Sequence, residues 1–184
     1  MKNQSDMANE VIEAQMWKWI DEFIIQENIC PFAKKERALS RIQLQCYSAS
    51  SALKTCDVLL EQIDKMHEDT GIETSILIAK DHLEDFDEYL FHLDEANRSL
   101  AQNGLEGQFQ LASFHPDYLF EGEPEESLSH YSNRAPYPCF HIIREESISQ
   151  ALKSFANPEN IPGRNIKHCE RLGKDFFDKL LDKV

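Results

Sequence analysis

The residues best suited to chemistry lie in three separate stretches of the sequence. Cys30 stands in "NICPFAKK", His115 in "SFHPDYLF" and His141 in "HIIRE". A cysteine thiolate attacks electrophiles and a nearby imidazole can take its proton, so we treat these three residues as candidate catalytic groups. The lysines that follow Cys30 would lower the pKa of its thiol. The pattern therefore predicts a cysteine enzyme in which His115 acts as the base.

The same three side chains also predict a metal site. Cys30, His115 and His141 are good ligands for Zn, Fe or Cu, and Glu73 or water could complete the set. The ligands come from three segments, so their spacing does not separate a metal-assisted enzyme from a metal-free one. The pair formed by Cys30 and Pro31 is a further candidate, because Cys-Pro ligates haem in some proteins, but a dipeptide is too short to be specific.

A long connection between two predicted strands carries the candidate substrate-binding residues. Residues 115–137 form it, whereas loops in compact domains usually have about four to six residues. Prolines at both ends restrict its backbone, so we predict an ordered flap over a polar pocket. Arg134 would point inward and bind an anionic small molecule through its guanidinium fork. The other predicted ligand-binding residues are Asn133, Tyr118, Tyr137 and Arg144.

The elements that must position these residues follow from the spacing of apolar side chains. Helical periodicity near the two ends of the chain and after the last strand predicts helices over residues 10–28, 145–156 and 164–182. Apolar runs or alternating patterns predict four strands, at residues 41–47, 74–79, 108–114 and 138–144. Two more helices join the first three strands, so those strands should be parallel, while the third and fourth should be antiparallel neighbours.

Capping residues place the ends of the two connecting helices. Ser50 or Ser51 can cap the first, and Asp81 can cap the second, which Gly104 should end. The elements predict one α/β domain, residues 1–184, with a mixed four-stranded sheet flanked by helices. The order β-α-β-α-β-β-α matches a thioredoxin-like arrangement, and a ferredoxin-like sandwich is the alternative.

Strand alternation predicts which side chains share a face of the sheet. His115, if the third strand continues to it, shares a face with Leu111, and His141 shares a face with Cys139. If these are the same face, the two imidazoles approach each other near one rim. We further predict that the Cys30 sulfur faces the same cavity as His115.

The composition of the chain limits the classes of binding partner and the cellular location that we expect. The chain has 184 residues and a formal net charge of −14, which argues against nucleic acids and anionic membranes, because both would be repelled. No stretch approaches the roughly 18 apolar residues of a membrane span, so we expect a cytoplasmic location. The five cysteines form no C-x-x-C pair, which favours reduced thiols over a disulfide framework. The motifs of phosphate loops, dinucleotide-binding folds, serine hydrolases and common metalloproteases are absent from the sequence.

Six short blocks resemble a bacterial family, the domain-of-unknown-function family 1415. The blocks are CPFA at 30–33, ETSILI at 73–78, GLEG at 104–107, SFHPDYLF at 113–120, NRAPYP at 133–138 and HIIRE at 141–145. The resemblance runs from about Trp17 to Gly173. The family usually has serine where this chain has Ala135, so a hydroxyl group there cannot be essential here. It tends to have other residues at His130, which lowers that histidine as a candidate. The resemblance implies no established activity, but its blocks contain the candidate residues named above.

These features predict a small-molecule enzyme with a Cys/His/Arg site under the 115–137 loop, with or without a metal. The alternative is a non-enzymatic module that binds a small ligand, a metal or haem, with the tyrosines of the loop as apolar walls.

Overall fold

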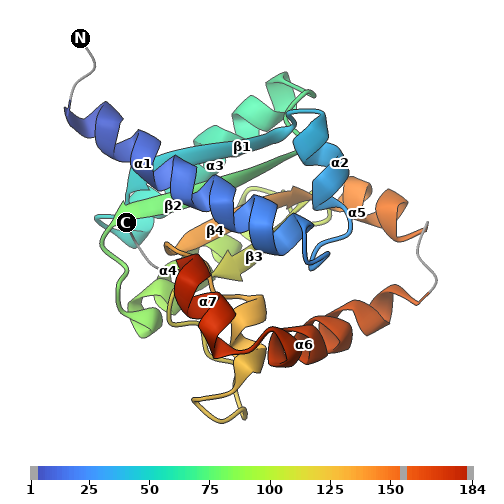
Figure 1. Ribbon diagram of the computed structural model, residues 1–184. Coiled ribbons are helices and arrows are strands. Elements are labelled where there is room, and N and C mark those ends of the chain that lie inside the picture. The colour runs from blue at the N-terminus through green and yellow to red at the C-terminus, as the bar shows by residue number, and fades with distance from the viewer. Residues whose placement is uncertain (1–3, 154–156, 182–184) are drawn as a thin grey trace.

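The computed structural model describes residues 4–153 and 157–181 of the chain. Four strands form one mixed sheet in the order β1-β2-β4-β3 (Figure 1). They are β1 Ile42–Ser48, β2 Thr74–Asp81, β3 Phe109–Phe114 and β4 Cys139–Arg144. β1 and β2 are parallel, and β4 pairs antiparallel with both β2 and β3, so β1, β2 and β3 all run in one direction. The predicted class, a mixed four-stranded sheet flanked by helices, is confirmed.

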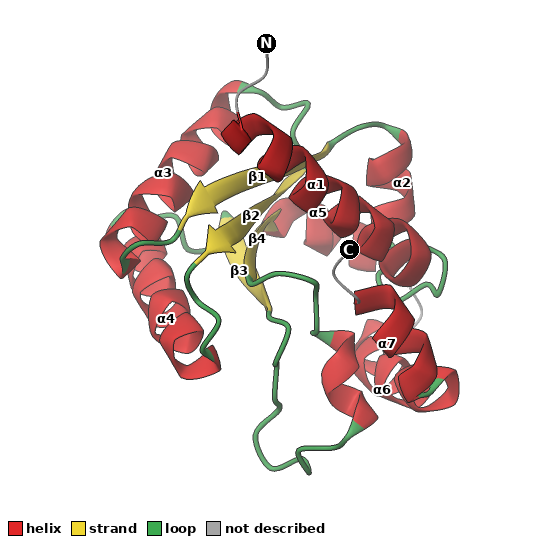
Figure 2. Ribbon diagram, turned by 60° about the vertical axis from the view of Figure 1, so that its left-hand side comes forward, coloured by secondary structure: helices red, strands yellow, loops and turns green. Residues whose placement is uncertain are grey.

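Helices cover both faces of the sheet (Figure 2). One face carries α3 Ala52–Glu68 and α4 Phe86–Gln102, and the other carries α1 Gln4–Trp19, α2 Ala33–Ala38 and α5 Glu145–Leu152. The chain ends with α6 Ile161–Leu172, which packs against the short 3-10 helix η2 Leu128–Ser132, and α7 Lys174–Leu181, which packs against α1. A further short 3-10 helix, η3 Pro158–Asn160, precedes α6.

The connections explain the strand directions. Helices α3 and α4 each carry the chain back over the sheet, so the strands that they join run the same way. The link from β3 to β4 has no such crossover, and these two strands are antiparallel neighbours as predicted. The chain order β-α-β-α-β-β-α is the predicted one. It differs from the β-α-β-β-α-β order of ferredoxin-like sandwiches, so that alternative does not describe this sheet.

Two of the predicted caps of the connecting helices form in the structure. Ser51 caps α3 by accepting a hydrogen bond from the Lys54 N–H group at 3.1 Å. Gly104 follows α4 with a φ of 67°, the left-handed conformation that glycine adopts at such ends. Both of these predictions are confirmed.

The predicted cap of α4 at Asp81 is wrong. Asp81 is the last residue of β2, and its carboxylate accepts a hydrogen bond from the Ala49 N–H group at 3.3 Å. His82 and Leu83 both have positive φ and turn the chain before the helix can start. Asp85 is the cap instead, because its carboxylate accepts from an N–H group in the first turn of α4.

The N-terminal helix differs from the predicted bounds of 10–28. It starts earlier, at Gln4, and after Trp19 it widens into a six-residue π-helix, η1 Ile20–Ile25. This unit ends at Ile25, before the predicted residue 28, and the chain turns at Asn28, whose φ is 54°, so Pro31 is not what ends it. The short helix α2 that follows was not predicted. All six residues of α2 have some exposure, so it lacks the buried stripe that sequence periodicity detects.

The C-terminal helix predicted over 164–182 is two helices. Gly173 has φ 75° and ψ 166°, which no α-helix can contain, and it separates α6 from α7. Residue 182 lies outside the described residues. The helix predicted over 145–156 begins at Glu145 and ends at Leu152, and residues 154–156 also lie outside the described part.

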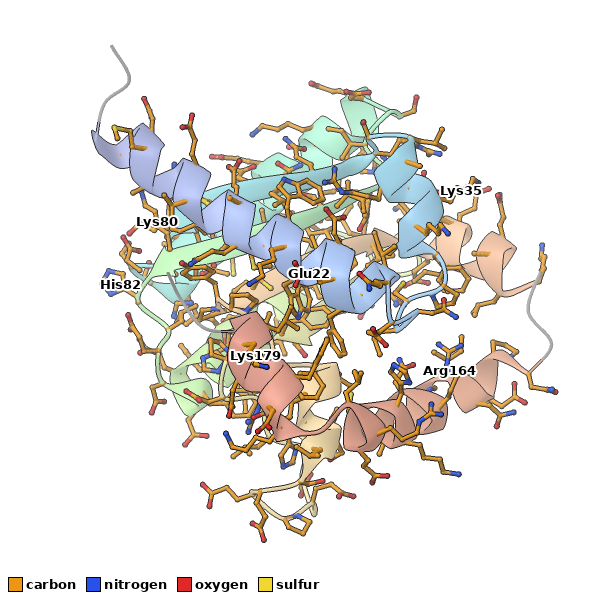
Figure 3. All side chains as sticks on the ribbon, in the orientation of Figure 1. Glu22, Lys35, Lys80, His82, Arg164 and Lys179 are labelled. Carbon is orange, nitrogen blue, oxygen red and sulfur yellow. The ribbon has the colours of Figure 1, made fainter. Side chains whose placement is uncertain are left out.

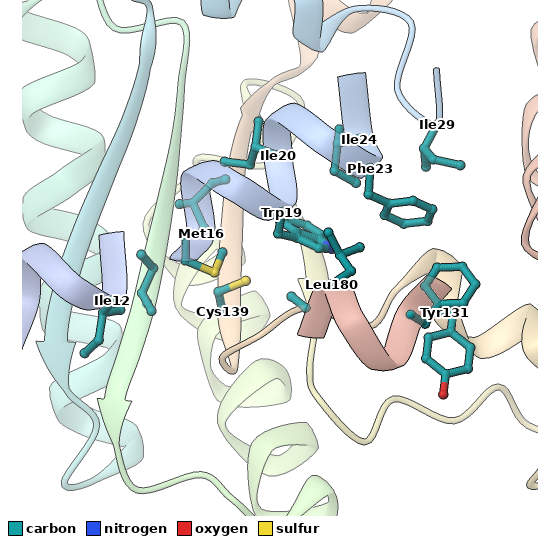
Figure 4. Packing of buried hydrophobic residues seen from close by; sticks show 14 of the residues in the cluster. Ile12, Met16, Trp19, Ile20, Phe23, Ile24, Ile29, Tyr131, Cys139 and Leu180 are labelled. Carbon is teal, nitrogen blue, oxygen red and sulfur yellow. The ribbon is translucent and has the colours of Figure 1, made fainter. Parts of the chain in front are cut away.

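Apolar side chains form one core on each face of the sheet. The core beneath α3 and α4 contains Leu59, Ile63, Leu77, Tyr89 and Phe140. The core on the other face is built on α1 and η1, whose side chains point toward the sheet and the C-terminal helices (Figure 4). Its members include Met16, Trp19, Phe23, Cys139, Tyr131 and Leu180. The second core is where a cavity opens.

Candidate functional site

The two candidate histidines lie on opposite faces of the sheet. His141 in β4 pairs with Ala112 in β3, and directly opposed residues share a face. Leu111, the neighbour of Ala112, therefore faces the other way and packs in the core beneath α3 and α4. His115 follows β3 and lies 5.0 Å from the ring of Tyr89 in α4. The predicted approach of the two imidazoles does not occur. It required a pairing of β3 with β4 that is shifted by one residue from the observed register.

His115 has the surroundings of a structural residue. It is fully buried, its Nε2–H group donates to the Leu83 carbonyl at 2.8 Å, and its Nδ1 accepts from the Asp117 N–H group at 3.0 Å. The ring also packs against Phe86 and Tyr89. Both ring nitrogens have main-chain partners, so this geometry does not fit a base or a metal ligand.

A cavity of about 440 Å³ lies between the sheet and the helices of the second core. Cys30 and His141 both line it, although they are far apart in the sequence. The prediction that Cys30 shares a cavity with His115 is therefore wrong, and Cys30 shares its cavity with His141 instead. Most of the wall is apolar and includes Trp19, Ile20, Ile24, Phe32, Ile76 and Phe114. Part of the cavity wall belongs to η1. π-helical segments are rare in proteins, and those that occur are frequently found at functional sites.

Main-chain groups and one arginine surround the Cys30 thiol. Burial raises the pKa of Cys30, and the N–H groups of Phe32 and Ala33 together with the Arg164 guanidinium offset this only in part. The predicted lowering of the Cys30 pKa by the following lysines is wrong. The side chain of Lys35 extends from the outer side of α2 into solvent (Figure 3). In this structure Cys30 is a thiol at neutral pH.

Helix α6 holds the segment that carries Cys30. The Arg164 guanidinium donates to the Asn28 carbonyl at 2.7 Å, and the Asn165 amide donates to the Ile29 carbonyl at 2.9 Å. Figure 3 shows Arg164 on the side of α6 that faces this segment. The position of Cys30 therefore depends on a helix that follows it by more than a hundred residues.

Thr74 fixes the position of the proton on His141. The Thr74 Oγ1 atom lies 2.6 Å from the Ile142 carbonyl oxygen and 2.5 Å from His141 Nε2. A carbonyl oxygen only accepts, so the hydroxyl group donates to it, and the Nε2–H group of His141 donates to the hydroxyl oxygen. His141 Nδ1 is then an acceptor, and it has no hydrogen-bond partner among the described residues. Burial lowers the pKa of His141 to about 4, so the ring is neutral near pH 7.

Two carboxylates bound to one arginine form a second polar group in the cavity wall. Glu36 and Glu73 both line the cavity. Arg41 Nη1 lies 3.2 Å from Glu36 Oε2, and Arg41 Nη2 forms an ion pair with Glu73 Oε2. One guanidinium neutralises only one of two carboxylates, so this group of three residues carries a net negative charge.

The 115–137 loop reaches the cavity only near its end. Ser132 and Asn133 line the cavity, and the Asn133 amide donates to the Ser113 carbonyl at 3.2 Å. The His115 N–H group donates to the Asn133 carbonyl at 3.2 Å and closes the base of the loop. Of the predicted ligand-binding residues, Asn133 is the one that the structure brings to Cys30 and His141.

A buried histidine holds the middle of the loop. His130 is fully buried, its Nδ1 accepts from the Phe120 N–H group at 3.0 Å, and its Nε2–H group donates to the Pro124 carbonyl at 2.8 Å. The loop is therefore an ordered excursion fastened by its own side chains, and most of it lies away from the cavity rather than over it.

Arg134 does not face the cavity that contains Cys30. Its Nε–H group donates to the Tyr118 carbonyl at 3.2 Å, and its guanidinium carbon lies 4.7 Å from the centre of the Tyr131 ring. It lines a different and more open hollow of about 500 Å³, together with Lys174 of α7. The Lys174 ammonium group is itself bound to Asp178. Arg134 is therefore not placed to anchor a ligand beside Cys30 and His141.

The remaining predicted ligand-binding residues have structural partners. The ring of Tyr118 lies 5.2 Å from that of Phe86, and the Tyr137 hydroxyl group bonds to the side chain of Gln15. The Arg144 guanidinium donates to main-chain carbonyls at the end of α3 and in the segment that follows it. Tyr118, Tyr137 and Arg144 are all outside the cavity wall.

The predicted metal site is not assembled. Within residues 4–153 and 157–181, no three His, Cys, Asp or Glu side chains are grouped so that they could hold a metal ion. The proposed ligands Cys30 and His141 share a cavity, but His115 lies on the other face of the sheet with both nitrogens engaged.

Sequence reasoning missed three residues of the cavity group, namely Glu36, Arg41 and Thr74, and named Glu73 only as a metal ligand. Glu73 and Thr74 stand together just before the apolar run of β2. A charged and a hydroxyl side chain at the start of a buried strand need hydrogen-bonding partners. This requirement could have marked both residues as candidates from the sequence.

A family model described as a protein of unknown function (DUF1415) matches residues 11–179 of this chain. No curated protein and no solved structure matches it. In the part of the chain that the structure describes, no helix is long and apolar enough to cross a membrane.

Proposed function

The chain belongs to the DUF1415 family of proteins of unknown function, and we propose that it binds a small, largely apolar organic molecule in the cavity that Cys30 and His141 line. The observation that carries this proposal is the cavity, which has a volume of about 440 Å³ and mostly apolar walls. Sites for small molecules in proteins are of roughly 300–1,000 Å³ and combine apolar walls with a few polar groups.

The polar groups of the cavity support the same proposal. Cys30 precedes α2, Glu73 directly precedes β2, which Thr74 starts, Asn133 lies near the end of the long loop, and His141 lies in β4. These groups converge from four parts of the chain on one space. A space that served packing alone would be expected to be filled, because protein interiors are close-packed.

A second candidate function is chemistry on the bound molecule. It is favoured by the presence of a thiol and an imidazole in one cavity wall, from Cys30 and His141. As it stands the site is not activated, because burial raises the pKa of Cys30 and lowers that of His141. An enzyme built on this site would need the ligand to favour ionisation of the thiol.

Binding is tested with the uncharged fluorophore N-phenyl-1-naphthylamine, whose emission increases in apolar surroundings. We expect the wild-type protein to bind it and Ala151→Trp to weaken binding, because Ala151 of α5 lines the cavity and the larger ring would occupy it. Ala101→Trp is the matched control, since Ala101 is an exposed residue of α4 on the other side of the sheet. Equal binding by all three proteins would contradict the proposal.

The enzymatic candidate is tested by the alkylation rate of Cys30 as a function of pH, read by peptide mass spectrometry. A thiolate population near neutral pH, seen as alkylation faster than that of a free cysteine, would support a nucleophile. Its raised pKa predicts slow alkylation that increases only at alkaline pH. That result would leave binding as the function of the cavity.

We also propose a cytoplasmic location. All five cysteines are free thiols in the structure. Free thiols persist in reducing compartments, which supports this location over an oxidising one. Localisation of a fluorescently tagged full chain by microscopy and fractionation would test it, and recovery outside the cytoplasmic fraction would contradict it.

A further inference from the structure

Two hydrogen-bond acceptors in the cavity lack donors. Glu73 accepts from Arg41 through Oε2, and its Oε1 has no hydrogen-bond partner within residues 4–153 and 157–181. His141 donates through Nε2 to Thr74, which leaves Nδ1 as an acceptor. Glu73 directly precedes Thr74, the first residue of β2, and Glu73, Thr74 and His141 all line the cavity, so both acceptors belong to its wall. A ligand that satisfies them must donate hydrogen bonds.

The charge of the cavity wall is negative. Among the described residues that line the cavity, Glu36 and Glu73 are the charged ones, and Arg41 neutralises one of them. Lys35 Nζ lies 3.8 Å from Glu36 Oε1, but its side chain is 75% exposed and the interaction is screened by solvent. Arg164 is engaged with main-chain carbonyls. A carboxylate in apolar surroundings is costly without a partner, which favours a cationic ligand.

The rest of the cavity is suited to an apolar body. Its aromatic and branched side chains come from α1, η1, the segment before α2, all four strands and α5. Burial of an apolar group against such walls contributes about 25 cal/mol for each Å² removed from water. The cavity thus joins one acidic, acceptor-rich cluster to a larger apolar space.

We infer that the ligand is an organic cation, namely a primary or secondary ammonium group attached to an aromatic or branched alkyl body. The ammonium group donates to Glu73 Oε1 and lies near His141 Nδ1, and the apolar body fills the space beside Trp19 and Phe114. This inference rests on the proposed function, because it names the class of ligand for the same cavity.

The inference is tested by competition against bound N-phenyl-1-naphthylamine with three compounds of one size and different charge. Phenylbutylamine is cationic near neutral pH, phenylbutanol is neutral and phenylbutanoate is anionic. We expect the amine to bind roughly tenfold or more tightly than the alcohol, as a charge-assisted hydrogen bond allows, and the anion to bind most weakly.

Two variants separate the local carboxylate from the field of the whole protein, whose net charge of −14 attracts any cation. Glu73→Gln removes the proposed partner and should reduce the preference for the amine to within about threefold of the alcohol. Glu68→Gln removes the same charge from an exposed position at the end of α3, on the other side of the sheet. It should leave the preference unchanged. Circular dichroism and thermal unfolding establish that both variants are folded.

The outcomes distinguish this inference from the proposed function. If the fluorophore binds and Ala151→Trp blocks it, but the amine competes no better than the alcohol, the cavity binds ligands and the cationic class is wrong. An equal loss of preference in Glu68→Gln and Glu73→Gln would also overturn the inference. If the fluorophore does not bind the wild-type protein, the proposed function fails and the inference fails with it. If Glu73→Gln does not fold, the wild-type series is repeated at about 300 mM NaCl, which screens the long-range attraction of the net charge, and loss of the preference for the amine there overturns the inference.

Discussion

Histidines of the same chain acquire different roles from their partners. His115 and His130 each use one ring nitrogen to donate and the other to accept, and both are fully buried. His141 uses one nitrogen to bond Thr74, and its other nitrogen has no hydrogen-bond partner among the described residues. An imidazole with two main-chain partners fixes the backbone, whereas one with a single partner retains a lone pair for a ligand.

The lowered pKa of His141 predicts a pH dependence of stability. Its pKa is about 4 in the folded protein and about 6.5 in the unfolded chain. The unfolded state therefore binds the proton more tightly. The contribution of His141 to the free energy of unfolding is full above pH 6.5 and is lost as the pH falls toward 4. Between about pH 7.5 and about pH 5 we expect a loss of about 2 kcal/mol in the free energy of unfolding.

Urea unfolding of wild type and His141→Gln at the two pH values measures this contribution. The variant should lose less stability than wild type by roughly that amount, because glutamine does not titrate. His67→Gln, at an exposed position near the end of α3, should behave as wild type. If His141→Gln had the wild-type pH dependence of stability, burial would not be lowering the pKa of His141.

The sequence shows which residue types are suited to chemistry better than it shows which of them meet. Cys30, His141 and Asn133 were predicted from residue type, and the structure places all three in one cavity wall. The expected partner of Cys30, His115, lies on the opposite face because the register of β3 on β4 differs by one residue from the required one. Alternation within a strand is local information, whereas register depends on the long connection between the strands.

The elements show a similar division between type and boundary. All four strands form close to their predicted positions, since apolar runs and alternation report burial directly. The start of α4 was misplaced because Asp81 and Asp85 are both good capping residues, and the choice depends on a turn at His82 and Leu83. The break between α6 and α7 was missed because the apolar pattern continues across it, although Gly173 itself is a helix-ending signal.

Gly173 gives a prediction at the scale of these two helices. Its φ of 75° and ψ of 166° lie in a region that is essentially restricted to glycine. Among the described residues, only its chain neighbours come within 4 Å of the position that a Cβ atom would take, so strain rather than a clash would result. We expect Gly173→Ala to lower the free energy of unfolding by about 1–3 kcal/mol in urea titrations.

The matched control is Gly163→Ala in the first turns of α6. Gly163 also has an open Cβ position, and its φ is not positive. Alanine is the better helix former, so this change should be neutral or stabilise by up to about 1 kcal/mol. Equal effects of the two substitutions would mean that the conformation of Gly173 is not what separates α6 from α7.

At the scale of the whole molecule, the dominant property is negative charge. The chain has 33 acidic residues against 19 lysines and arginines. Ion pairs such as those of Arg41 and Arg37 compensate part of this charge locally, but an excess of 14 negative charges remains. Such an excess repels itself in the compact state more than in the unfolded chain, and it also raises the local concentration of cations at any opening.

Salt should therefore stabilise the protein at neutral pH. An increase in NaCl from about 20 mM to about 300 mM shortens the screening length from roughly 20 Å to below 10 Å and weakens the repulsion. Salt also weakens the exposed ion pairs, but these contribute little. We expect the melting temperature to increase by about 2–4 °C, which corresponds to about 1 kcal/mol for a chain of this size.

The isoelectric point supplies the control for the salt effect. Near pH 4.9 the net charge of the chain is close to zero, so screening has no excess repulsion to remove. There the same increase in NaCl should leave the melting temperature unchanged or lower it, because only the attractive pairs are screened. An equal increase at both pH values would assign the stabilisation to a general effect of salt on apolar surface, and the charge excess would then have no measurable part in the stability of the fold.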